Sequence, residues 1–292
     1  MPDHPPLTEL RFLTGLIGAP IAHSASPAMH ERAARALGAH GHYQLIEVAG
    51  ADSAGLRALL DGVRRLGFAG VNITFPYKEA VVGLLDALAP TAAAMQAVNT
   101  VVVRDGRLTG HNTDTTGFAR AAHDLVEASQ SGPVAVIGAG GVGKAIAFAL
   151  AALGVRDIRI HDSDAAKSRA LAAAVPSGAA TAVAGLAAAL DGVAGLVNAT
   201  PVGMLPNRGT PVPDALLHSG LWVADAVYSP LWTPLLTAAK ARGAQVMTGR
   251  ELAIYQAADA FELFTGLKPS AAEMGKAFDA VMAKRYAASN AA

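Results

Sequence analysis

The stretch Val134-Ala-Val-Ile-Gly-Ala-Gly-Gly-Val-Gly-Lys-Ala-Ile-Ala-Phe-Ala-Leu150 decides the fold of the second half of the chain. Four apolar residues typical of a buried strand lead into a Gly-x-Gly-x-x-Gly turn, and an apolar helical pattern follows. In such a turn the first glycine permits the tight bend, the second lets a pyrophosphate approach the backbone, and the third lets helix and strand pack closely. The stretch therefore predicts a dinucleotide-binding loop made of Gly138, Ala139, Gly140, Gly141, Val142 and Gly143.

An acid beyond this loop favours a ligand over the alternative, a turn that is merely rich in alanine and glycine. Asp162 follows the predicted strand 158–161, about 20 residues past the loop, where a carboxylate accepts hydrogen bonds from the ribose hydroxyls of NAD and repels the 2′-phosphate of NADP. The sequence thus favours NAD over NADP. In the alternative reading, Asp162 and Asp164 only cap the next helix, and Lys167 or Arg169 reaches a phosphate.

Apolar runs alternate with helical patterns along the whole chain, which predicts an α/β protein with mainly parallel sheets. We expect two domains: an α/β substrate-binding domain over 1–113, a Rossmann-like nucleotide-binding domain over 114–248, and C-terminal helices over 249–292. Predicted strands are 13–18, 43–48, 70–74, 98–103, 134–137, 158–161, 196–199, 223–227 and 245–247, and predicted helices of the first half are 27–37, 53–66, 76–88 and 115–129.

Composition excludes several classes of function. The 292 residues contain no cysteine, so a disulfide framework, a thiolate zinc site and a cysteine nucleophile are excluded, and the scattered histidines predict no metal site. The 23 basic and 23 acidic residues balance, which argues against nucleic acid or an acidic membrane as partner and favours a small molecule. The longest uncharged stretch, 170–190, is interrupted by polar residues, glycine and proline, so we expect no membrane span and a cytoplasmic protein.

A polar surplus marks the stretch Val71-Asn-Ile-Thr-Phe-Pro-Tyr-Lys-Glu-Ala80, where a strand should run into a helix. Asn72 and Thr74 alternate onto one face of the strand. Pro76 suits the first turn of a helix, which would put Lys78 beside the positive end of the helix dipole and favour proton exchange by its ammonium. A solvated lysine beside Glu79 is the alternative.

Other polar residues stand at the ends of predicted elements. Ser24 and Ser26 place two hydroxyls at a helix start, an arrangement suited to a carboxylate. Asn99 interrupts an apolar strand, and Gln256 shares a helical face with apolar residues, so both amides need partners. Asp114 either serves chemistry or caps the helix that follows.

Seven motifs, in order over nearly the whole chain, resemble the signatures of shikimate dehydrogenases: GLIGAPIAHSASPAMH, GVNITFPYKEAV, AVNTVV, GHNTDTTGF, VNATPVGM, DAVYSPLWTPLL and AFELFTG. The resemblance implies a substrate domain to which the C-terminal helices return, and a separate nucleotide domain. It implies that Ser24 and Ser26 hold the substrate carboxylate and that Lys78 and Asp114 are the catalytic pair. Ring hydroxyls would bind Asn72, Thr74, Asn99 and Gln256, with Tyr228 near the substrate or simply packed, and Thr200, Val227 and Gly249 would be further cofactor contacts.

The expected function is reversible NAD-linked oxidation of shikimate or quinate by hydride transfer. Asp162-Ser163-Asp164 stands where NADP-using members commonly read Asn-Arg-Thr, so the chain is more similar to the NAD-dependent quinate/shikimate type. Alternatives are an aminoshikimate or other quinate-like polyol dehydrogenase, or a dinucleotide-binding sensor without catalysis. The sequence does not decide which of quinate and shikimate is the preferred substrate, or whether the role is biosynthetic or catabolic. It also leaves the oligomeric state open, and a homodimer is one state that it allows.

Overall fold

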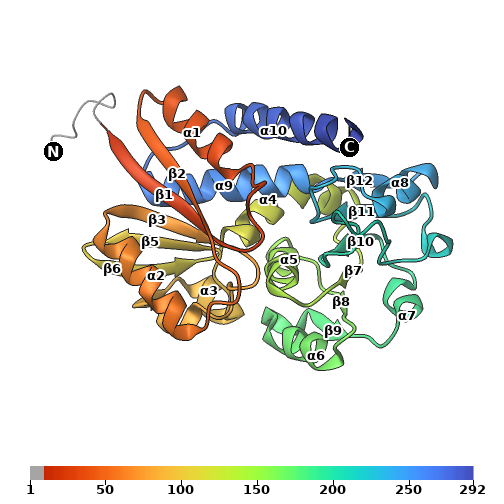
Figure 1. Ribbon diagram of the computed structural model, residues 1–292. Coiled ribbons are helices and arrows are strands. Elements are labelled where there is room, and N and C mark those ends of the chain that lie inside the picture. The colour runs from red at the N-terminus through yellow and green to blue at the C-terminus, as the bar shows by residue number, and fades with distance from the viewer. Residues whose placement is uncertain (1–9, 292) are drawn as a thin grey trace. The chain divides into compact units, whose positions relative to one another are not determined.

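The computed structural model describes residues 10–291, and the side chains of residues 10–287 (Figure 1). These residues form two compact units. The first comprises the described residues up to Thr113 together with those from Gln256 onward, and the second is Asp114–Tyr255. The second division falls inside helix α9 (Gly249–Thr265), so one continuous helix contributes to both units.

The sheet of the first unit has the strand order β2-β1-β3-β5-β6-β4, and β5 runs opposite to the other five of these strands. The first three strands pair in parallel, as expected from the sequence, whereas β5 is antiparallel to both β3 and β6. The strands are β1 Arg11–Gly18, β2 His40–Glu47, β3 Phe68–Ile73, β4 Ala87–Leu88, β5 Thr100–Arg104 and β6 Arg107–His111. The helices are α1 Ser26–Ala36, α2 Ser53–Arg65, α3 Pro90–Met95 and α10 Ala271–Ala291.

Helices cover both faces of this sheet. On one face, Leu56 and Leu60 of α2 pack with Val101 in a buried cluster. On the other face Val102, the next residue along β5, packs with Phe264 of α9, because successive strand side chains point to opposite faces. Helices α1 and α10 lie side by side (Figure 1) and are joined by an ion pair between Arg32 and Glu273, with 2.5 Å between Nη2 and Oε2.

The second unit has the sheet expected from the glycine-rich stretch. All of its strands are parallel, in the order β12-β11-β10-β7-β8-β9, which is the 3-2-1-4-5-6 order of a dinucleotide-binding fold. The strands are β7 Val134–Ile137, β8 Ile158–His161, β9 Ala180–Ala182, β10 Gly195–Asn198, β11 Trp222–Asp225 and β12 Gln245–Met247. The helices are α4 Thr113–Ala128, α5 Gly141–Ala152, α6 Ala165–Ala174, α7 Leu186–Leu190 and α8 Pro234–Ala241, and short 3-10 turns occupy η3 Pro176–Gly178 and η4 Asp214–Leu216.

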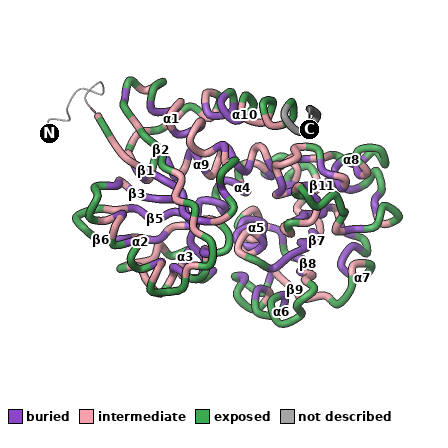
Figure 2. Tube along the Cα trace, viewed as in Figure 1, coloured by how far each residue is buried: buried purple, intermediate pink, exposed green. Residues whose placement is uncertain are grey.

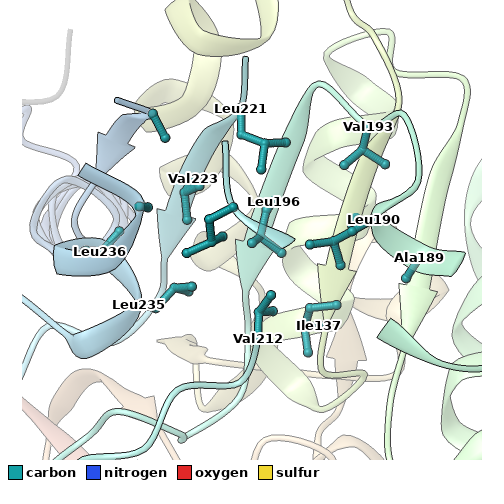
Figure 3. Packing of buried hydrophobic residues seen from close by; sticks show 14 residues of the cluster. Ile137, Ala189, Leu190, Val193, Leu196, Val212, Leu221, Val223, Leu235 and Leu236 are labelled. Atoms are coloured by element: carbon teal, nitrogen blue, oxygen red, sulfur yellow. The ribbon is translucent and has the colours of Figure 1, made fainter. Parts of the chain in front are cut away.

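The core of this unit is an apolar cluster between the sheet and helices α7 and α8 (Figure 3). Leu196 and Val223 on adjacent strands belong to this cluster together with Leu235 of α8, and so do Ile137 of β7 and Leu190 of α7. The central strands β7, β10 and β11 are buried throughout, while β9 and β12 at the edges are partly exposed (Figure 2). Burial on both faces is why these strands read as continuous apolar runs.

The helix predicted over 76–88 is wrong. That segment forms turns, a short 3-10 element η2 (Val82–Leu84) and strand β4. The carbonyl of Lys78, which a helix would pair with residue 82, accepts a 2.8 Å hydrogen bond from the N–H of Val98 instead. The buried side chains of Tyr77 and Val81 pack in the same core cluster as the residues of β3, so the segment contributes to that core without forming a regular helix. Lys78 therefore does not stand in the first turn of a helix, and the helix-dipole argument for it fails.

None of the helices among residues 10–291 contains a stretch that is both long and apolar enough to cross a bilayer.

Candidate active site

The loop before α1 brings two hydroxyls together. Oγ of Ser24 donates to Oγ of Ser26 at 3.1 Å, and the N–H of Ser26 donates back to Oγ of Ser24 at 3.2 Å. Both serines are half-buried, and α1 begins at Ser26 after Ala25, so Ser26 is the first helical residue. The two hydroxyls converge on one point at a helix start, where a carboxylate could be bound by both.

Thr74 lies immediately beyond β3, packed against the end of β1. Its N–H donates to the carbonyl of Ile17 at 2.9 Å. A Cβ at Gly18 would overlap Cγ2 of Thr74 and lie 2.9 Å from the carbonyl oxygen of Phe75. Only glycine at position 18, the last residue of β1, leaves room for Thr74, which follows the neighbouring strand β3. This close packing fixes the position of the threonine.

Asn72 is buried, with 7% of its surface exposed, and its amide is engaged on every side. Oδ1 accepts a 2.8 Å hydrogen bond from Oη of Tyr43. Nδ2 donates to the carbonyl of Asn99 at 3.2 Å and to Oγ1 of Thr100 at 3.0 Å. Because both amide hydrogens are used within the protein, Asn72 can contact a ligand only by accepting through Oδ1.

Asn99, 3% exposed, occupies the centre of the same polar network. Its Oδ1 accepts from the N–H of Thr113 at 2.7 Å and from Oγ1 of Thr100 at 2.9 Å, and its Nδ2 donates to Oγ1 of Thr113 at 3.0 Å. Asn99 stands just before β5 and not inside a strand as predicted, and its buried amide has the partners that burial requires. The network also ties the end of β3 and the start of β5 to the residue at which α4 begins.

Lys78 and Asp114, the predicted catalytic pair, belong to different units. Lys78 is half-buried in the turn after Tyr77, whose Oη donates to the carbonyl of Val48 at 2.8 Å and accepts from the N–H of Ala51 at 2.9 Å. Asp114 is buried as the second residue of α4. The position before the helix is Asn112, so Asp114 does not occupy the N-cap position that the capping alternative requires.

The remaining predicted substrate residues are half-buried. Gln256 lies in α9 between Leu252 and Ala260, both of which are buried, as its place on an apolar helical face led us to expect. Tyr228 follows β11 in the second unit. Both stay predicted contacts.

The three glycines of the motif after β7 stand in three different environments. Gly138 has φ of +106°, and a Cβ there would lie 2.9 Å from the backbone of Ala199. A Cβ at Gly143 would overlap the carbonyl oxygen of Gly138. A Cβ at Gly140, by contrast, would have no atom of the described chain within 4 Å. The fold itself demands Gly138 and Gly143, whereas the space beside Gly140, at the N-terminus of α5, is open to a phosphate, so the loop fits a dinucleotide.

Asp162 is tied to this loop. Its Oδ2 accepts from the N–H of Ala139 at 2.7 Å and its Oδ1 from the N–H of Asp164 at 2.8 Å. Burial disfavours its ionised form, but the two backbone N–H groups and the charge of Lys167 outweigh burial and hold the pKa of Asp162 below its ordinary value. Asp164, not Asp162, caps α6, accepting from the N–H of Ala166 at 2.9 Å. Asp162 therefore binds the backbone of the glycine loop, whereas Asp164 caps α6.

Thr200, Val227 and Gly249 lie where strands β10, β11 and β12 end. The N–H and Oγ1 of Thr200 both donate to Oδ1 of Asn198, at 2.9 and 2.7 Å. A Cβ at Gly249 would stand 2.6 Å from the carbonyl oxygen of Val227. In a sheet of this order, a ligand binds where the strand order reverses, which here is between β7 and β10. Gly138 and Thr200 flank that point.

Comparison with known proteins agrees with this architecture. Residues 16–101 match the model of the shikimate dehydrogenase substrate binding domain. Shikimate dehydrogenase (NADP(+)) of Streptomyces avermitilis is 44% identical over 276 residues, covering 92% of this chain and 95% of that protein. The chain belongs to the shikimate dehydrogenase family.

Members of the family that resemble this chain differ in cofactor and substrate. Quinate/shikimate dehydrogenase (NAD(+)) of Corynebacterium efficiens is 45% identical over 276 residues, covering 91% of this chain and 97% of that protein. The structure of quinate dehydrogenase from Corynebacterium glutamicum in complex with NAD superposes with a TM-score of 0.86 at 41% identity, covering 92% of this chain and 99% of the other. Shikimate 5-dehydrogenase from Thermus thermophilus, in complex with NADP(H) and shikimate, gives a TM-score of 0.82 at 38% identity, covering 92% of this chain and 99% of the other. The family and the Rossmann-type fold expected from the motifs are confirmed.

Sequence reasoning missed four buried polar residues that organise the two units of this family member: Tyr43, Asn198, Asp225 and Thr233. Asn198 and Asp225 each end an otherwise apolar strand, so the same argument that singled out Asn99 could have found them. Burial raises the pKa of the Asp225 carboxyl to about 6, because hydrogen bonds from Thr233, Val227 and Asn198 offset only part of the cost of burying the charge.

Proposed function

We propose that this chain catalyses the reversible NAD-linked oxidation of shikimate, quinate or both to the 3-dehydro acid by hydride transfer. Whole-length similarity to shikimate and quinate/shikimate dehydrogenases supports the reaction class. The single observation that carries the proposal is the Asp162 carboxylate, hydrogen-bonded to the Ala139 N–H of the glycine loop at 2.7 Å. It supports a dinucleotide site whose ribose end is acidic.

The first unit would bind the acid. The adjoining hydroxyls of Ser24 and Ser26 suit its carboxylate, and Thr74, Asn99 and Gln256 suit its ring hydroxyls. Asn99 uses one amide hydrogen on Thr113, so among the described residues its second remains to donate to a ligand. Asn72 would accept from a hydroxyl through Oδ1, and Tyr228 would lie near the substrate.

Lys78 and Asp114 would handle the proton. In the oxidation direction Lys78 accepts the proton of the reacting hydroxyl, while ionised Asp114 hydrogen-bonds the hydroxyl or the ammonium and holds the two in line. The nicotinamide ring of the dinucleotide, when bound, supplies the hydride acceptor. The residues proposed to hold the dinucleotide are the loop Gly138–Gly143, Asp162, Thr200, Val227 and Gly249.

Preference for NAD over NADP rests on the charges at the end of β8. A 2′-phosphate on the ribose would meet the Asp162 carboxylate, and the following exposed residues are Ser163 and Asp164 where an arginine would be needed to pair with it. Relatives of both cofactor types exist, so the preference is a proposal about this chain. Lys167 is the cation that would support the opposite outcome, because its charge acts on Asp162.

Steady-state rates with shikimate and quinate, each paired with NAD and NADP, test the proposal in one experiment. We expect turnover with at least one acid, and a higher kcat/KM with NAD than with NADP. Binding of dinucleotide without turnover on either acid would favour a sensor. Turnover confined to an amino-substituted or other polyol analogue would favour the second enzyme reading. Comparable kcat/KM for the two cofactors would remove the NAD assignment while leaving the reaction intact.

A further inference from the structure

Asp225 is a buried carboxylate for which the proposed reaction has no role. It ends β11, is 1% exposed, and accepts three hydrogen bonds: from Nδ2 of Asn198 at 2.9 Å, from the N–H of Val227 at 2.9 Å and from Oγ1 of Thr233 at 2.7 Å. These three donors are neutral. A buried carboxylate held by neutral donors is costly, so stability alone is a poor reason for its presence.

The first hydrogen bond fixes the turn after β10. Asn198 uses its Nδ2 on Asp225 and on the carbonyl of Val202 at 3.1 Å, and its Oδ1 accepts from both the N–H and the hydroxyl of Thr200. The turn so formed packs against the glycine loop, because a Cβ at Gly138 would lie 2.9 Å from the Thr200 side chain. Asp225 thereby holds Asn198 in the rotamer that places the Thr200 turn against the glycine loop.

The second hydrogen bond fixes the segment after β11. Val227 is buried, its N–H is bound by Asp225, and its carbonyl oxygen would lie 2.6 Å from a Cβ added at Gly249, so only glycine fits there. One carboxylate thus sets two adjacent segments, at the ends of β10 and β11.

These segments lie on one side of the point where the strand order reverses. Asp162, at the end of β8, marks the adenosine side, and the glycine loop, at the end of β7, marks the pyrophosphate. The remaining half of a dinucleotide must extend in the other direction, over the ends of β10 and β11.

We propose that Asp225 is a positioning residue for the nicotinamide half of the cofactor, acting through Asn198 on the Thr200 turn and directly on Val227. The inference rests on the proposed function only in assuming that the second unit binds a dinucleotide. It assigns no contact between Asp225 and the cofactor itself.

The third hydrogen bond supplies an internal control. Thr233 is the N-cap of α8, where its Oγ1 accepts from the N–H of Leu236 at 3.3 Å while donating to Asp225. Replacing Thr233 with valine removes this bond and weakens the cap without touching Asn198 or Val227. Thr233→Val therefore lowers the stability of the fold but keeps the two hydrogen bonds through which Asp225 holds Asn198 and Val227.

The experiment compares Asp225→Ala, Asp225→Asn and Thr233→Val with the unmodified protein, using calorimetric titration with NADH, steady-state KM for NAD and for the acid, and thermal denaturation. An asparagine can still accept from Asn198 and Val227 and donate to Thr233, so it should rescue. We expect Asp225→Ala to weaken NADH binding and raise KM for NAD roughly tenfold, with KM for the acid within about twofold. Asp225→Asn should stay within about threefold of the unmodified protein, and Thr233→Val should lower Tm while leaving both cofactor constants unchanged.

Unaltered NADH affinity in folded Asp225→Ala overturns the inference, as does a loss of affinity in Thr233→Val equal to that in Asp225→Ala. If Asp225→Ala does not fold, Asn198→Ala takes its place, since it cuts the path to Thr200 while keeping the bonds of Asp225 to Val227 and Thr233. Normal NADH affinity in that variant overturns the part of the inference that acts through Asn198 on the Thr200 turn. NADH binding without turnover by the unmodified protein refutes the proposed reaction alone, whereas no NADH binding at all refutes both.

Discussion

The hydroxyl of Tyr43 donates a 2.8 Å hydrogen bond to Oδ1 of Asn72, and thereby orients the amide whose two hydrogens hold Asn99 and Thr100. Tyr43 lies on β2, remote in sequence from both strands it organises. It makes the polar end of the first sheet a network with a fixed arrangement instead of a set of independent side chains.

Removing that hydroxyl should loosen the substrate site. Tyr43→Phe leaves the buried Oδ1 of Asn72 without this donor, which should cost about 1–3 kcal/mol of stability and raise KM for the acid several-fold. Tyr77→Phe is the matched control, because Tyr77 is equally buried but its hydroxyl bonds to the backbone of Val48 and Ala51. Steady-state kinetics with melting curves should show both variants less stable and only Tyr43→Phe altered in KM.

Gly18 should be intolerant of even one added methyl group. A Cβ there overlaps the methyl of Thr74, so Gly18→Ala should displace the threonine and lower kcat/KM for the acid by about tenfold. Gly62→Ala, in the last turn of α2 where a Cβ meets no described atom within 4 Å, should instead be neutral or stabilising by about 0.5–1 kcal/mol. Equal kinetics in the two variants would mean that the position of Thr74 does not matter to the reaction.

Lys78→Ala should lower kcat by about 10²-fold or more and leave KM for the acid within a few-fold, as expected for a group that acts mainly in the transition state. Asp114→Asn should behave in the same way. Lys276→Ala serves as a charge-matched control, since Lys276 pairs with Glu273 on the surface of α10 at 2.6 Å. An unchanged kcat in Lys78→Ala would end its catalytic role.

His30 should make the protein sensitive to mild acid. It is 2% exposed, neither ring nitrogen has a hydrogen-bond partner in the described part of the chain, and it stacks on Tyr43 with ring centroids 4.5 Å apart. Burial lowers its pKa from 6.5 to about 3. Below its unfolded pKa the imidazole is protonated in the unfolded chain but not in the folded one, so stability falls as the pH drops below about 6.5.

The size of this effect follows from the two pKa values. Between pH 7 and pH 5 the histidine should remove about 2 kcal/mol of the free energy of unfolding, and His30→Leu should lack that loss. Urea denaturation at both pH values, with the unmodified protein and the variant compared at each, isolates the histidine from the carboxylates that titrate nearby. Parallel losses in the two proteins would contradict the assignment.

The sequence predicted best those elements whose apolar pattern and turn chemistry agree. Strands 134–137, 158–161 and 245–247 were predicted with the observed bounds, because each is a short segment with apolar residues such as Ile160 and Val246, closed by a glycine or polar turn. The helix predicted over 76–88 is wrong because Leu85 and Leu88 have helical spacing yet pack in the core from a bend and from strand β4, and tertiary hydrogen bonds such as Val98 N–H to Lys78 C=O replace the helical ones. Tyr43 could not be assigned a role, since its partner Asn72 lies 29 residues away and only the folded sheet brings them together.

The cofactor prediction turns on what Asp162 and Asp164 each do. Asp162→Ala should lower kcat/KM for NAD and raise it for NADP, because the ribose loses an acceptor and the 2′-phosphate loses a repelling charge. Since Oδ2 of Asp162 also holds the Ala139 N–H, part of the loss with NAD will come from a looser glycine loop and will affect both cofactors. The ratio of the two kcat/KM values cancels that common part.

Asp164→Ala is the control, because it removes the cap of α6 and one nearby negative charge but leaves the Asp162 carboxylate in place. A ratio that shifts in Asp162→Ala by tenfold or more and moves little in Asp164→Ala identifies Asp162 as the discriminating group, at roughly 1.4 kcal/mol per tenfold. Equal shifts in the two variants would instead assign the preference to the general negative potential at the end of β8.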